Sequence, residues 1–131
     1  MYKVLAILTS CFTGFILWIL YMANTNQHTM YFEIVQQTPY GDKIGHVVLF
    51  GLLTLFINLV TIGKSVCISS VNIYTGTVLV TVFVTFEEMS QLFFTSRTFD
   101  LLDYAASLIG VLMFSGITYL IENAESRRRK N

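Results

Sequence analysis

The sequence predicts an all-α integral membrane protein, a single domain over residues 1–131 built as a bundle of four transmembrane helices. Of its 131 residues, 54% are hydrophobic and 12% are charged. So few charges cannot cover the surface of a small soluble domain. A membrane-spanning helix needs roughly 20 predominantly apolar residues. Four stretches reach or approach that length, at residues 4–23, 44–62, 71–94 and 101–121.

Each predicted span has its own local signals. The first contains no charged residue, and the second follows the turn-forming triplet Pro39-Tyr40-Gly41. The third is rich in β-branched residues, which in water favour a strand, but its length and the exclusion of open sheet edges from lipid favour a helix. The fourth begins around Asp100, a residue type suited to a helix N-cap. Short connections are expected between the spans.

The charges divide unequally between the two sides that four spans define. The side of the termini has six basic and two acidic residues, a net charge of +4, whereas the opposite side has two basic and six acidic residues, a net charge of −4. The six basic residues are Lys3, Lys64, Arg127, Arg128, Arg129 and Lys130. Because Lys and Arg concentrate in cytoplasmic segments, both termini are predicted to be cytoplasmic. The basic tail is interpreted as an orientation signal that also contacts anionic lipid, and no nucleic-acid binding is predicted.

Polar side chains interrupt the apolar stretches near their outward ends. Each ionisable group at bilayer depth costs on the order of 3 kcal/mol, so these residues need partners, a watery cavity or a function. His46 lies one helical turn after Asp42, and Glu88 and Gln91 share one face of the third span. The short connection that contains Arg97 makes the third and fourth spans antiparallel neighbours. The predicted ligand-binding residues are Asp42, Lys43, His46, Glu88, Gln91, Arg97, Asp103 and Ser107.

The order and spacing of these side chains carry a family resemblance. They read Asp42-Lys43-x-x-His46-x-x-x-Phe50, then Glu88-x-x-Gln91, Arg97, Asp103 and Gly110. This combination resembles the VanZ-like family of small membrane proteins, named for a protein associated with resistance to the glycopeptide antibiotic teicoplanin. Where the family usually has Asn, four residues after the Asp, this chain has Ser107. The resemblance implies a multi-pass protein of the cell envelope and does not supply a reaction.

Structural roles account for part of the cluster. Asp42 and Asp100 are suited to N-caps, and Lys43 to an anchor at the membrane interface. Glu88 lies too deep for a cap, and a bidentate ion pair with Arg97 would tie the third and fourth spans together. Such interhelical ties are common in membrane bundles.

The functional interpretation is a pocket that binds a membrane lipid or a lipid-linked cell-wall precursor. In it, Arg97 holds an anionic group while Glu88, Gln91 and Asp103 bind hydroxyls or amides. The alternative is a membrane hydrolase or transferase, so the chain is not assigned as an enzyme or a non-enzyme. Its candidate catalytic residues are His46, Glu88 and Asp103, with His46 or Glu88 as general base. A lone His on an apolar face is more often a hydrogen-bonded tie than a base, so the structural role of His46 is the favoured one.

The sequence gives weaker evidence for a metal site and for a proton or ion conduit. His46, Glu88 and Asp103 are sensible ligands for a divalent ion, but their spacing is not diagnostic, so neither a metal nor a cofactor is predicted. A proton or ion conduit would need polar residues along the inner halves of the spans, and none are expected to match the outer cluster. The oligomeric state does not follow from the sequence.

Overall fold

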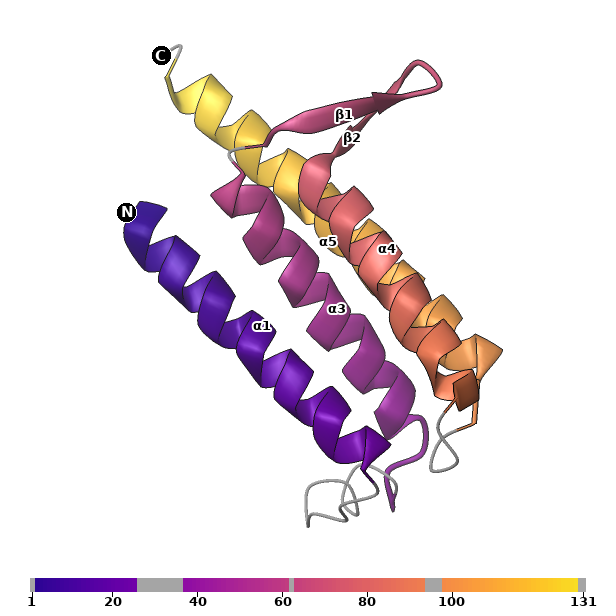
Figure 1. The fold of residues 1–131 in the computed structure, drawn as a ribbon. Coiled ribbons are helices and arrows are strands. Elements are labelled where there is room, and N and C mark those ends of the chain that lie inside the picture. Colours follow the sequence, from indigo (N-terminus) through magenta and orange to yellow (C-terminus); the bar gives the residue numbers. More distant parts are fainter. Residues whose placement is uncertain (1, 26–36, 62, 94–97, 130–131) are drawn as a thin grey trace.

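The computed structural model describes residues 2–25, 37–61, 63–93 and 98–129, and these are helical apart from one hairpin. The helices are α1 (Tyr2–Asn24), α3 (Gly41–Val60), α4 (Thr75–Ser90) and α5 (Leu101–Arg128), and a short 3₁₀ helix, η1 (Gln91–Phe93), follows α4. Strands β1 (Ser65–Ile68) and β2 (Val71–Tyr74) pair in antiparallel fashion between α3 and α4. The four helices lie side by side and alternate in direction (Figure 1).

Among the residues that the structure describes, three helices are long and apolar enough to cross a membrane. They cover Lys3–Asn24, Gly41–Val60 and Leu101–Arg128. Helix α4 has 16 residues, which corresponds to about 24 Å of helix against a hydrocarbon core of roughly 30 Å. The all-α class is therefore confirmed, three helices are compatible with membrane insertion by length and composition, and a fourth crossing by α4 stays a prediction.

The predicted start of the third span, at residue 71, is wrong. Residues Val71–Tyr74 form β2, which pairs with β1 so that Val66 lies opposite Ile73. The turn residues Ser69 and Ser70 have φ angles of 48° and 73°, and positive φ at both positions is typical of tight two-residue hairpin turns. The β-branched residues at the beginning of this apolar run thus form a strand, and the helix starts at Thr75.

A buried polar network fixes the start of α4. Asn58 of α3 accepts a hydrogen bond from the Thr77 amide at 3.1 Å and donates to the hydroxyls of Thr77 and Thr118 at 3.2 and 3.4 Å. A Cβ at Gly76 would collide with the Asn58 side chain, so glycine allows this close approach. The expectation that the inner halves of the spans lack matching polar residues is therefore wrong. Here uncharged side chains of α3, α4 and α5 satisfy one another.

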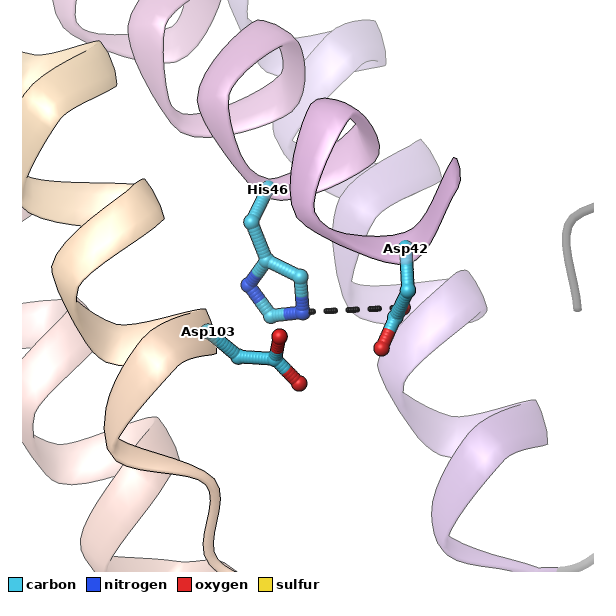
Figure 2. A group of neighbouring side chains, drawn as sticks. All are labelled: Asp42, His46 and Asp103. Carbon is cyan, nitrogen blue, oxygen red and sulfur yellow. Dashed lines mark ion pairs between the residues drawn. The ribbon is translucent and has the colours of Figure 1, made fainter. Parts of the chain in front are cut away.

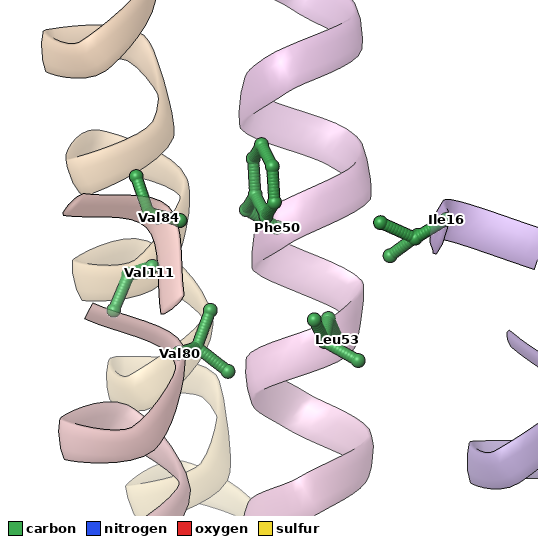
Figure 3. Close-up of a cluster of buried hydrophobic side chains, with 6 residues drawn as sticks. All are labelled: Ile16, Phe50, Leu53, Val80, Val84 and Val111. Carbon is green, nitrogen blue, oxygen red and sulfur yellow. The ribbon is translucent and has the colours of Figure 1, made fainter. Parts of the chain in front are cut away.

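Helix α3 lies at the centre of the bundle and packs against α1, α4 and α5. The buried apolar core draws on all four helices, with Ile16, Phe50, Leu53, Val80, Val84 and Val111 converging in Figure 3. Helices α3 and α5 are in close contact at Gly110, where a Cβ would meet the backbone of Val47. This contact sets the starts of α3 and α5 side by side.

The two ends of the bundle differ in charge. The hairpin end contains the start of α1, the hairpin and the end of α5 (Figure 1), and with them Lys3, Lys64 and the arginines from Arg127. We call the opposite end, where α3 and α5 begin and α4 finishes, the His46 end. These five basic residues thus share one end of the bundle, as the charge pattern predicts.

Candidate functional site

Nine polar side chains gather at the His46 end from three helical segments. They are Asp42, Lys43 and His46 of α3, Glu87, Glu88 and Gln91 of α4 and η1, and Asp100, Asp103 and Ser107 at the beginning of α5. Several lie inside the protein, with exposed fractions of 1% for Glu88, 0% for Ser107 and 8% for both His46 and Asp103. We call this set the polar cluster.

The α3 side of the cluster is set by the turn that precedes the helix. Tyr40 adopts a left-handed conformation with φ of 60°, and the Gly41 amide donates to the Thr38 carbonyl at 2.9 Å. The N-cap is therefore Tyr40, and the predicted N-cap role of Asp42 is wrong. Asp42 lies in the first turn, where a carboxylate is favoured by the helix dipole. This position also aligns it with His46, one turn further along.

The α5 side begins with the predicted cap. The Asp100 carboxylate accepts a hydrogen bond from the Leu102 amide at 2.8 Å, which confirms Asp100 as the N-cap. This hydrogen bond, followed by the contact with the Lys43 ammonium, holds the pKa of Asp100 below its usual value. Asp103 then lies in the first turn of α5. Both carboxylates face α3.

Lys43 connects the two helices. Its Nζ donates to Asp103 Oδ1 at 2.9 Å and to Asp100 Oδ2 at 3.3 Å. Only 26% of the Lys43 side chain and 12% of the Asp103 side chain are exposed. The interpretation of Lys43 as a simple interface anchor is therefore wrong, because its charge is used within the protein to neutralise the start of α5.

His46 contacts both neighbouring helices. Its Nδ1 lies 2.9 Å from the Ser107 hydroxyl and 4.0 Å from Glu88 Oε1. Its Nε2 faces Asp42 Oδ1 at 3.9 Å, as Figure 2 shows. Ser107 also donates to the Asp103 carbonyl at 3.0 Å. The ring is thus held by α5 on one nitrogen and directed toward a carboxylate on the other.

Helix α4 contributes a residue that sequence reasoning left out of the site. Glu87 is buried and accepts a hydrogen bond from Gln91 Nε2 at 3.0 Å. The four-residue spacing of Glu87 and Gln91 was the signal that could have identified the pair. Arg97 lies outside the described residues, so its pairing with Glu88 stays a prediction.

Three of these side chains are arranged as potential ligands. Asp42, His46 and Asp103 each offer one ligand atom, and these atoms all lie within 4.8 Å of one another (Figure 2). The combination differs from the set considered from the sequence, since Asp42 takes the place of Glu88. All three side chains point into the space between α3 and α5.

The described part of the polar cluster is acidic. Its five carboxylates face one permanent cation, Lys43, so acceptor oxygens predominate. Carboxylates accept hydrogen bonds from hydroxyls and amides and attract cations. Comparison of the chain with protein families, curated proteins and solved structures finds no match.

Proposed function

We propose that this chain is a VanZ-like multi-pass membrane protein that binds the polar headgroup of a membrane amphiphile in the polar cluster. A lipid-linked cell-wall precursor is the leading class of ligand. The supporting observation is the convergence of His46, Glu88 and Asp103 from three helices at one end of an apolar bundle. The arrangement of the resembling residues at this end also supports the family proposal.

The hairpin end provides the comparison that favours function over packing. There, Asn58, Thr77 and Thr118 join the same three helices through uncharged hydrogen bonds. Buried ionisable groups cost on the order of 3 kcal/mol each, far more than such amides and hydroxyls. A bundle that can tie its helices with neutral groups has no structural need for several carboxylates and a histidine. The charged cluster is therefore attributed to binding.

The balance of donors and acceptors indicates the ligand chemistry. Carboxylates such as Asp42 and Glu87 are acceptors only, and they suit the hydroxyl and amide donors of a sugar or peptide headgroup. Lys43, part of whose side chain is exposed, can approach a lipid phosphate beside the carboxylates it already contacts. The positive-inside rule favours an extracytoplasmic position for this end.

A membrane hydrolase or transferase acting on a lipid headgroup is the second candidate. It is favoured by the orientation of His46, whose Nε2 faces the Asp42 carboxylate while Nδ1 is held by Ser107. An oriented imidazole is the usual general base. Ser107 is not suited as a nucleophile, because it is fully buried and donates its proton to the Asp103 carbonyl. Turnover of a lipid substrate would distinguish this candidate from binding alone.

Mass spectrometry of retained lipids tests the binding proposal. The full chain would be purified in a mild detergent as wild type, as Asp42→Asn and as Glu125→Gln. The Asp42 side chain is 62% exposed, so its substitution should leave the fold intact, and Glu125 is an exposed carboxylate in the last turns of α5. We expect one lipid class to be retained by the wild type and the control and depleted about tenfold, or 1.4 kcal/mol, in Asp42→Asn. Identical lipid profiles would refute the proposal.

Teicoplanin susceptibility tests the family part of the proposal separately. Expression of the wild type in a susceptible bacterium should raise the inhibitory concentration of teicoplanin, and expression of Asp42→Asn at equal membrane abundance should not. If the wild type and an empty vector give the same inhibitory concentration, the link to resistance is wrong even where a lipid is retained.

A further inference from the structure

We propose that Asp42, His46 and Asp103 form a binding site for a divalent transition-metal cation of the Mn²⁺ or Zn²⁺ type. Asp42 and His46 lie one turn apart on α3, and Asp103 faces them from the first turn of α5 (Figure 2). Their ligand atoms lie within 4.8 Å of one another. Imidazole and carboxylate together suit first-row transition ions better than Mg²⁺ or Ca²⁺, which prefer oxygen ligands alone.

The hydrogen bonds of Ser107 determine which nitrogen of His46 is available. The Asp103 carbonyl oxygen can only accept, so the Ser107 proton points to it across 3.0 Å. The Ser107 oxygen then accepts from His46 Nδ1–H at 2.9 Å. In the neutral ring this arrangement leaves the lone pair on Nε2. A metal-binding histidine commonly has its other N–H held in this way, which fixes the tautomer and the ring orientation.

The negative charge around His46 Nε2 favours the binding of a cation. Only 8% of His46 is exposed. Within the described residues its Nε2 has no hydrogen bond, and Asp42 Oδ1 lies 3.9 Å from it. A lone pair directed toward carboxylates is repelled by them unless a positive charge lies between. The positive charge of Lys43 offsets that of Asp100, with which it pairs at 3.3 Å, so the carboxylates of Asp42 and Asp103 leave a net charge of −2. One divalent ion balances this charge.

The geometry needs only a small adjustment to hold the ion. Ligand atoms about 2.1 Å from a metal lie roughly 3.0 to 3.5 Å from one another in tetrahedral or octahedral sites. Rotation of the largely exposed Asp42 side chain would shorten the present separations. Lys43 Nζ already contacts Asp103 Oδ1 at 2.9 Å. The other carboxylate oxygen of Asp103 would therefore bind the metal ion. The ammonium therefore competes electrostatically with the metal without blocking the site.

Substitution of Lys43 distinguishes the metal site from the proposed lipid function, because the two predict opposite changes in affinity. Loss of its positive charge should strengthen metal binding, because one repulsive charge is removed beside the ion. The same loss should weaken retention of a phosphate-bearing lipid. Metal binding measured on lipid-free protein in a neutral detergent succeeds or fails independently of the amphiphile.

Titration of the purified full chain with MnCl₂, followed by the electron paramagnetic resonance signal of aqueous Mn²⁺, tests the proposal. We expect one saturable site per chain, from which Zn²⁺ displaces Mn²⁺ because Zn²⁺ binds such ligands more tightly. Asp42→Asn and His46→Gln should each weaken binding at least about tenfold, and Ser107→Ala about 10- to 100-fold through loss of ring orientation. Lys43→Gln should strengthen binding.

Asp100→Asn is the matched control, because Asn keeps the N-cap while one carboxylate of the same cluster is removed. Its affinity should stay within about threefold of the wild type, as expected for a charge outside the ligand set in a partly hydrated site. Equal losses in Asp100→Asn and Asp42→Asn would reveal unspecific attraction to an acidic surface and overturn the proposal. Failure of the folded wild type to bind Mn²⁺ or Zn²⁺ saturably would overturn it as well.

Discussion

Lys43 and Asp100 show which residue roles are local and which depend on packing. Asp100 was predictable as a cap, because the hydrogen bond from Leu102 involves residues two positions apart. The pairing of Lys43 with Asp103 spans 60 positions and depends on the rotation of α3 relative to α5. The spacing of residues within either helix does not indicate this relative rotation. The histidine and carboxylates were identified as a cluster, but their individual partners were not.

Tyr74 gives the protein a pH-dependent contact at the hairpin end. Its hydroxyl donates to Glu122 at 2.8 Å, and burial, followed by this hydrogen bond, raises the pKa of Tyr74 to about 12 from 10.0. A raised pKa in the folded state means that the stabilisation is complete below pH 10 and is lost as the pH approaches 12. The melting temperature of the wild type should therefore fall more steeply over this range than that of Tyr74→Phe. Parallel curves in a thermal-melting series would contradict this contact.

At the scale of elements, hydropathy did not predict the hairpin. No charged residue separates β2 from α4, so hydropathy alone does not show where the strand ends and the helix begins. Helices α1, α3 and α5 were predicted within a few residues, except that α5 continues to Arg128. The Asn58 network was missed for a related reason. Single Asn and Thr residues are unremarkable in an apolar stretch, and their pairing appears only when helices face one another.

The close approach of α3 and α5 depends on Gly110. A methyl group there would meet backbone atoms of Val47, which cannot move aside as a side chain can. Gly110→Ala should therefore destabilise the protein by about 2 to 3 kcal/mol through overpacking. Gly116→Ala on the same helix meets nothing within 4 Å and should be neutral or stabilising by up to about 1 kcal/mol. Thermal unfolding in detergent measures both, and equal effects would show that the two helices do not touch at Gly110.

The arrangement of the whole molecule follows from the alternating direction of its consecutive helices (Figure 1). The start of α1, the hairpin, the end of α5 and most of the described basic residues share one end, while the polar cluster lies at the other (Figure 1). This separation was predictable, because alternating spans place alternate connections on opposite sides. The contacts inside the cluster were not, since they arise from how α3, α4 and α5 rotate against one another.

Labelling with a membrane-impermeant maleimide tests the orientation of the molecule. Cys67 is exposed on the hairpin, and in a Cys11→Ser background it should react only after cells are permeabilised, because the basic end is expected to be cytoplasmic. Tyr40→Cys, at an exposed position of the His46 end, in a chain lacking both native cysteines should react on intact cells. The reverse pattern would place the polar cluster in the cytoplasm and contradict an extracytoplasmic site.

The central claim is that the buried charges of the polar cluster serve ligand binding rather than folding, and the melting temperature of Glu88→Gln tests it most directly. Gln has nearly the same shape as Glu and removes the cost of a charge that is 1% exposed. We predict that the variant, in detergent and without added ligand, melts within about 3 °C of the wild type or above it. A decrease of about 10 °C or more, as expected when a buried ion pair is broken at a cost of about 3 kcal/mol, would contradict the claim and make Glu88 a structural tie.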